Sequence, residues 1–216
     1  PAGTYAEYAT APAEHVLPKP ESVDFTEAAA LPMVSLTAWQ ALFEAGELAE
    51  GQTVLIHGAA GGVGHVAVQL AKWRVAQVIA TASDRNAQFL SQLGGDTHID
   101  YRTTRFEDVA RDVDVVLDSA GGEIQERSWP VLRKGGLLVT IRSSAGVAEK
   151  APFYGVRARQ LLVRREPTHF SGINELVVSG KLRPVVSAVY PLTQARDAHE
   201  QIELGHTRGK VVLRAQ

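Results

Sequence analysis

The chain has 216 residues, of which 45% are hydrophobic and 21% are charged, and its formal net charge is −2. This composition is typical of a globular protein, and the length suits one large domain or one and a half ordinary ones. The absence of a basic excess argues against nucleic-acid partners, and no apolar run is long enough to span a membrane. Because there is no cysteine, disulfides and cysteine-ligated metals are excluded, and a cytoplasmic protein is expected.

Strands and helices alternate through the middle of the chain. Strands are predicted at 53–58, 77–82, 97–100, 113–118, 137–141 and 159–165. The helices between them are expected to begin near residue 63, to cover about 85–93, and to run from about 123 into the "LRKGG" of 132–136. This alternation predicts an α/β fold with a doubly wound parallel sheet.

The two flanks do not continue this pattern. Residues 1–25 have prolines at 12, 18 and 20, among others, and are expected to form loops and short strands. After Pro184 we expect a strand at 185–190, a helix near 193–204 and a last strand at 210–215. We interpret both flanks as parts of a second unit.

A glycine-rich stretch, "HGAAGGVGHVAVQLAK" (57–72), follows the first strand of the alternation and opens a helix. In this context Gly61 and Gly62 would let a pyrophosphate approach the backbone N–H groups at the helix start, with Ala60 and Val63 beside them. Gly64 would let the helix pack closely on the strand. The strict G-x-G-x-x-G pattern is not met, because Ala59 stands in place of its first glycine. The alternative is a tight turn that holds no ligand.

Four segments, "LPMVSLTAWQAL", "GQTVLIHGAAGGVGHVAVQLAK", "VIATASDRN" and "GKVVLR", together resemble the zinc-independent medium-chain dehydrogenases/reductases of the quinone-oxidoreductase type. In that family "AAGGVG" replaces the glycine motif. The resemblance implies a Rossmann dinucleotide-binding domain at 26–180. It implies that 1–25 and 181–216 are remnants of a GroES-like, β-rich catalytic domain, most of whose N-terminal part lies outside this sequence.

The end of the second strand indicates which dinucleotide is bound. It carries Ala82 where NAD-binding relatives place an aspartate for the ribose 2′-OH, and Asp84 comes two residues late. Ser83 and Arg85 would instead bind a 2′-phosphate, so NADP(H) is the expected cofactor. The alternative is that Arg85 is a solvated residue in the first turn of a helix. The resemblance places Tyr101 near the same phosphate.

The resemblance also assigns residues to the nicotinamide end of the cofactor. It places Thr37 near the nicotinamide, although a helix hydroxyl bonded to its own backbone is the simpler interpretation. The loops after the fourth and fifth strands, with Ser119, Ala120 and Ile141, would hold the nicotinamide ribose and ring. Asp118 is a candidate acid, but a turn-capping aspartate is more common at a strand end. We assign no catalytic residue.

No metal site is expected. The seven histidines show no i, i+4 pair, and Met33 aligns with a cysteine ligand of the zinc-dependent branch. The resemblance implies a homodimer and hydride transfer from NADPH to a small molecule: a quinone, an enone or an enal. Two alternatives stay open, an enoyl-thioester reductase and a non-enzymatic NADP(H)-binding module or redox sensor. Upstream sequence would show whether the catalytic half exists.

Overall fold

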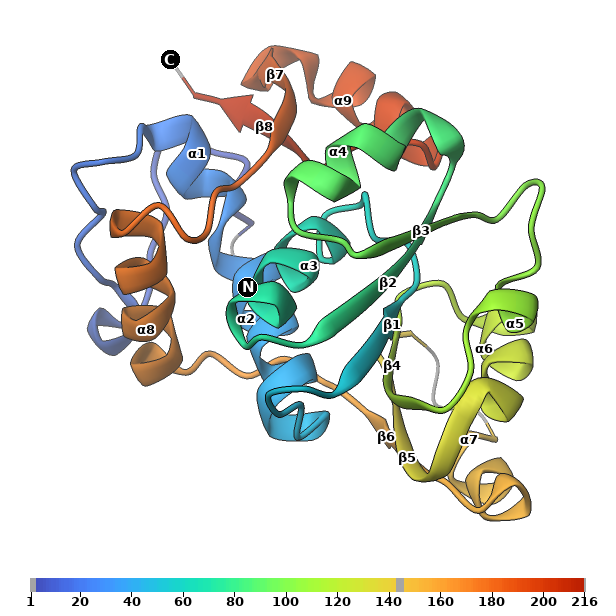
Figure 1. Cartoon of the computed structure of the whole chain (residues 1–216). Coiled ribbons are helices and arrows are strands. Elements are labelled where there is room, and N and C mark those ends of the chain that lie inside the picture. Colours follow the sequence, from blue (N-terminus) through green and yellow to red (C-terminus); the bar gives the residue numbers. More distant parts are fainter. Residues whose placement is uncertain (1–2, 143–145, 216) are drawn as a thin grey trace.

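A computed structural model describes residues 3–142 and 146–215 (Figure 1). Six parallel strands form the main sheet in the order β3-β2-β1-β4-β5-β6. Their bounds are Thr53–Ile56 (β1), Gln77–Ala82 (β2), Thr97–Asp100 (β3), Val113–Asp118 (β4), Leu132–Thr140 (β5) and Arg157–Gln160 (β6). The order is that of the dinucleotide-binding Rossmann fold, so the predicted doubly wound α/β fold is confirmed.

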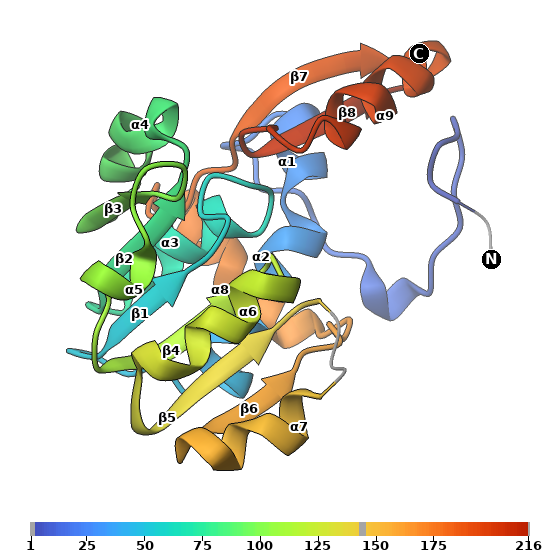
Figure 2. The same cartoon turned by 90° about the vertical axis from the view of Figure 1, so that its right-hand side faces the viewer.

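Helices cover both faces of this sheet (Figure 2). Because side chains alternate along a strand, Val54 and Ile56 face one core and Leu55 faces the other, and all three are fully buried. One face carries α2 (Pro32–Trp39), α3 (Gly64–Trp73), α4 (Ala87–Gln92) and α8 (Pro167–Val178). The other carries α5 (Phe106–Val109), α6 (Gly122–Ser128) and α7 (Val147–Lys150). Strands buried on both faces explain the continuous apolar runs in the sequence.

The C-terminal residues form a small separate sheet. Strands β7 (Val186–Pro191) and β8 (Lys210–Arg214) are parallel and are connected by α9 (Ala195–Glu203). They lie beside α1 (Phe25–Ala30), which Asp24 and Glu27 begin with a capping box (Figure 2). The strand, helix and strand predicted after Pro184 are therefore confirmed. The division into a catalytic and a dinucleotide-binding domain stays a prediction.

The N-terminal flank differs from expectation. Residues 3–24 contain one 3-10 helix, Ala13–His15, and no strand. The short strands expected there are therefore wrong for the described residues, because none of residues 3–24 pairs with a strand of either sheet. No helix of the described chain has the length and apolarity needed to cross a membrane.

Two further boundaries were predicted wrongly. Helix α6 ends at Ser128, and a 3-10 turn follows at Trp129–Val131, because Pro130 has no N–H with which to continue a helix. The "LRKGG" is therefore the start of β5 and not the end of a helix.

The sixth strand covers 157–160 and not 159–165, because its partner β5 ends at Thr140. Beyond it, the backbone of Arg164 bonds to the side chain of Gln40. The Gln40 Nε2 donates to the Arg164 carbonyl oxygen at 2.8 Å, and Gln40 Oε1 accepts from the Arg164 N–H at 2.9 Å.

Candidate dinucleotide site

The glycine loop leaves β1 where the strand order reverses, at the centre of the sheet. Gly58 has a φ of 64°, and its carbonyl accepts from the Gly61 N–H at 3.0 Å. A Cβ on Gly64 would lie 2.3 Å from the Gly58 carbonyl oxygen and 2.6 Å from the Ala59 Cα. Only glycine therefore allows α3 to begin this close to β1, which confirms the packing role predicted for Gly64. Ala59 is fully buried in the core.

The start of α3 offers unused hydrogen-bond donors. Among the residues that the structure describes, the N–H groups of Gly62 and Val63 have no acceptor. They precede a ten-residue helix, whose N-terminal end carries partial positive charge. A Cβ on Gly61 would meet only the Gly58 carbonyl oxygen, at 3.2 Å, so this side of the loop is open. Open donors at a helix start fit an anionic group such as a pyrophosphate.

Gly62 is more crowded than expected. A Cβ there would lie 3.1 Å from the Lys210 Cδ and 3.6 Å from the Val34 Cγ1. The C-terminal strand thus packs directly on the loop, and the Gly209 N–H donates to the Ala60 carbonyl oxygen at 2.8 Å. Gly62 therefore makes room for the protein's own chain.

A pocket of about 120 Å³ extends from the glycine loop along the end of β2. It brings together several residues that were predicted to bind the cofactor: Ala60, Gly61, Ser83, Arg85 and Tyr101. The rest of the lining consists of Gly58, Ala82, Asn86, Gly205, His206 and Thr207. No acidic residue lines the pocket, so its chemistry fits a phosphate better than a ribose diol alone.

The C-terminal loop, residues 205–208, also contributes to the pocket, and no pattern in the sequence indicated this. The Arg85 guanidinium donates to the His206 carbonyl oxygen at 2.7 Å. Arg208 donates to the Asn86 Oδ1 at 3.0 Å and to the Arg85 carbonyl oxygen at 3.1 Å. Asn86 in turn donates to the Ser83 Oγ at 3.1 Å. Arg85 is therefore tied to this loop and is not only a solvated cation of the first helical turn.

The other predicted residues do not line this pocket. The Thr37 hydroxyl donates to the Met33 carbonyl oxygen at 2.6 Å, within its own helix. The Ser119 hydroxyl donates to the His57 carbonyl oxygen at 2.7 Å. Ala120 lies on the loop after β4, and Ile141 lies directly after β5. The Ile141 N–H donates to the carbonyl oxygen of Asp118, the last residue of β4, so the ends of the two strands are held together.

Asp118 caps the turn after β4. Its Oδ1 accepts from the N–H groups of Ala120 at 3.0 Å and Gly121 at 2.7 Å, and its Oδ2 accepts from the Gln125 amide at 2.7 Å. The side chain is fully buried. These contacts confirm the capping interpretation over that of an acid catalyst.

A buried histidine connects three of the elements around the site. His57 Nε2 lies 2.9 Å from the Ser128 Oγ, and Nδ1 lies 3.1 Å from the Thr81 Oγ1. The Ser128 hydroxyl donates to the Ile124 carbonyl oxygen, so it accepts from His57 Nε2–H, and Thr81 donates to Nδ1. Burial lowers the pKa of His57 to about 4, so the ring is neutral near pH 7. Nothing local in the sequence indicated this network.

No group of three potential metal ligands occurs among the described residues. The absence of zinc stays a prediction, and metal content of the protein tests it.

Comparisons with known proteins identify relatives over most of the chain. The protein-family profile described as zinc-binding dehydrogenase matches residues 93–213. The mitochondrial NAD(P)H oxidoreductase RTN4IP1 of Mus musculus is 32% identical over 241 residues, which cover 98% of this chain and 61% of that protein. The chloroplastic NADPH-dependent alkenal/one oxidoreductase of Arabidopsis thaliana is 32% identical, with 98% and 53% covered. The chain therefore spans less than two thirds of these relatives.

Solved structures of oxidoreductases are also similar to this chain. The quinone oxidoreductase from Coxiella burnetii superimposes with a TM-score of 0.88 at 39% identity, covering 93% of this chain and 64% of that one. The CurK enoyl reductase gives a TM-score of 0.84 at 33% identity, covering 94% and 66%. The chain therefore belongs to the zinc-binding dehydrogenase family within the medium-chain dehydrogenases/reductases, and it is of the quinone-oxidoreductase type.

Proposed function

We propose that the chain is the dinucleotide-binding part of an NADPH-dependent reductase acting on a quinone, an enone or an enal. The observation that carries the cofactor assignment is the pocket at the end of β2, where Ser83, Arg85 and Tyr101 meet without an acidic residue. The unused N–H groups of Gly62 and Val63 would hold the pyrophosphate. When bound, the cofactor would supply the hydride, and this chain would bind and orient it.

Titration with NADPH and NADH tests the cofactor assignment. NADPH should bind more tightly, because its 2′-phosphate gains charge-assisted hydrogen bonds in the pocket. Arg85→Ala should weaken NADPH binding by about 1–3 kcal/mol and leave NADH binding nearly unchanged. Arg111→Ala is a matched control, because Arg111 is exposed and lies before the amino end of β4, whereas the pocket lies at the carboxyl ends of the strands. Equal affinity for both dinucleotides in the unchanged chain would contradict the assignment.

The alternative substrate is an enoyl thioester, which the similarity to the CurK enoyl reductase favours. Asp118 is buried and bonded through both carboxylate oxygens, so it is not offered as the proton donor. Comparing turnover of a simple quinone, an enone and an enoyl-CoA by the full-length protein separates these substrates. NADPH binding without turnover of any of them would favour a non-enzymatic module.

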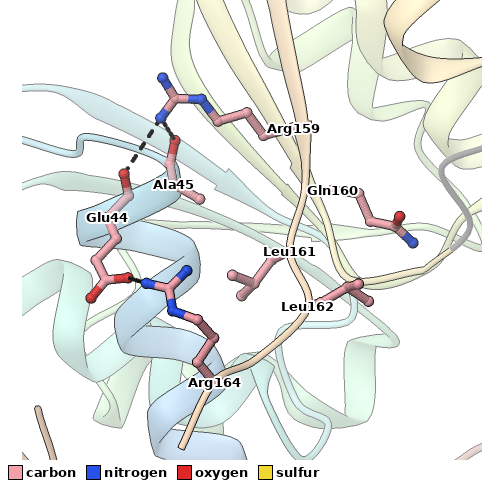
Figure 3. A pocket seen from close by; sticks show the side chains of 7 residues that line it. All are labelled: Glu44, Ala45, Arg159, Gln160, Leu161, Leu162 and Arg164. Atoms are coloured by element: carbon pink, nitrogen blue, oxygen red, sulfur yellow. Dashed lines mark hydrogen bonds and ion pairs between the residues drawn. The ribbon is translucent and has the colours of Figure 1, made fainter. Parts of the chain in front are cut away.

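We further propose a homodimer formed through β6. No described strand pairs with the outer edge of β6. Beside it is a hollow of about 730 Å³, shown in Figure 3, where Leu161 and the exposed Leu162 lie between Arg159 and Arg164. Arg164 pairs with Glu44 at 2.7 Å, and Arg159 donates to the Ala45 carbonyl oxygen at 2.8 Å. An unpaired edge next to an exposed leucine fits pairing with a second copy.

A further inference from the structure

The His65 side chain is fully buried in the first turn of α3 and uses both of its ring nitrogens. Nδ1 lies 2.9 Å from the Gly61 carbonyl oxygen, which accepts a hydrogen bond, so Nδ1 carries the proton. Nε2 accepts from the Val185 N–H at 3.1 Å. One neutral tautomer satisfies both contacts. Burial lowers the pKa of His65, which keeps this tautomer uncharged.

This side chain fixes the direction of one peptide group in the glycine loop. The Gly61 carbonyl oxygen accepts from the backbone N–H of His65 at 3.1 Å as well as from Nδ1. In a trans peptide the N–H points opposite to the carbonyl, so the Gly62 N–H points away from His65. Two donors on one oxygen hold this orientation against a flip of the peptide.

The neighbouring carbonyl groups are held in the same way. The Gly58 carbonyl accepts from the Gly61 N–H, and the Ala60 carbonyl accepts from the Gly209 N–H. The carbonyl oxygens of Gly58, Ala60 and Gly61 are therefore all engaged by the protein, while the Gly62 and Val63 N–H groups remain unused in the described chain. If the Gly61–Gly62 peptide flipped, the Gly61 carbonyl oxygen would face the phosphate and repel it. The Gly62 N–H would then no longer be available to bind the phosphate.

We propose that His65 is a positioning residue for the dinucleotide: it holds the Gly61–Gly62 peptide so that the Gly62 N–H faces the pyrophosphate. The inference rests on the proposed cofactor site. His65 does not contact the cofactor. Its contact with Val185 links the same loop to the segment that leads into β7, so the imidazole is held from both sides.

The chain contains a matched control one turn along the same helix. Gln69 Nε2 donates to the His65 carbonyl oxygen, four residues back, at 2.9 Å, and also to the Arg183 carbonyl oxygen at 3.0 Å. Gln69 thus contacts the segment before β7 without contacting the glycine loop carbonyls. It also shows that a glutamine on this face of α3 donates to the carbonyl four residues back while contacting the neighbouring segment.

The experiment compares the affinities of His65→Leu, His65→Gln and Gln69→Leu for NADPH and NADH. His65→Leu should weaken both by on the order of tenfold, with their ratio unchanged, because the pyrophosphate is common to both and one charge-assisted hydrogen bond is lost. His65→Gln should restore the affinity to within about twofold, since glutamine supplies the donor to Gly61. Gln69→Leu should lower the melting temperature and leave both affinities unchanged.

The outcomes separate the inference from the proposed function. If the unchanged chain binds neither dinucleotide, the proposed function fails and the inference fails with it. If the unchanged chain binds but folded His65→Leu binds equally well, or His65→Gln is as weak as His65→Leu, the inference alone fails. Should His65→Leu not fold, His65→Phe, which is closer in shape to the imidazole, takes its place under the same criteria.

Discussion

Gly64 lies where the backbone of α3 touches the backbone of the preceding loop. A methyl group there would overlap the Gly58 carbonyl oxygen and the Ala59 backbone, neither of which can move without breaking the turn. Gly64→Ala should therefore lower the free energy of unfolding by about 1–3 kcal/mol or more, in spite of the higher helix propensity of alanine. Urea denaturation measures the change.

Gly172→Ala is the control for this prediction. Gly172 lies within α8, and a Cβ there would meet only the Trp39 ring, at an ordinary 3.5 Å. This substitution should stabilise the protein by up to about 1 kcal/mol through helix propensity. A Gly64→Ala protein as stable as Gly172→Ala would mean that the glycine loop is more adaptable than its contacts indicate.

His57 should make stability depend on pH in a defined window. Its pKa is lowered from 6.5 to about 4 by burial, so between these values the unfolded chain binds more protons than the folded one. The contribution is therefore complete above pH 6.5 and is lost as the pH falls toward 4, by at most about 3 kcal/mol. His57→Gln should show a smaller loss of unfolding free energy across this window. Equal losses in both proteins would exclude His57 as the cause.

Among the elements, the edge strand β6 is where two copies of the chain are proposed to pair. Leu162 is 74% exposed beside Arg159 and Arg164, so Leu162→Lys would add a third cation where two copies are proposed to meet. The substitution should shift the protein from dimer to monomer in sedimentation velocity, because like charges are brought together. Val178→Lys, at an exposed position on α8, should leave the association unchanged. A monomeric unchanged chain would contradict the proposal directly.

The central strands of the sheet were predictable because β1, β2 and β4 are short, largely apolar runs bounded by turns. The prediction failed where the boundary of an element depends on residues that are distant in the sequence. The end of β6 depends on where β5 ends, and the Gln40 side chain takes over the backbone bonds of Arg164 from 124 residues away. The "LRKGG" has the composition of a helix end, and only Pro130 indicated that the helix had already stopped.

In the candidate site, too, the residues in local patterns were predictable and those brought in by folding were not. Ser83, Arg85 and the glycine loop lie at strand ends, where a sequence pattern is informative. The C-terminal loop that completes the pocket comes from more than 100 residues along the chain, as the contact of Arg85 with His206 shows. The roles of His57 and His65 were not predictable, because each depends on partners brought together only by folding.

For the whole molecule, the family description and the composition lead to opposite expectations about zinc. The matching family is described as zinc-binding, yet this chain has no cysteine, and no three potential ligands meet in its described residues. We therefore expect purified protein, dialysed without chelator, to contain far less than one zinc per chain by mass spectrometry of its metals. One retained zinc per chain would contradict the zinc-independent assignment.

Gln40 and Gln69 hold single residues of the main chain on either side of α8. Each amide side chain is buried and bonds to both the N–H and the carbonyl of one residue, Arg164 before the helix and Arg183 after it. Both arginines lie outside helices and strands, where backbone amides ordinarily exchange quickly with solvent deuterium. Their amides should instead exchange as slowly as those of the central strands, because each is exposed only when the buried glutamine side chain that holds it moves away.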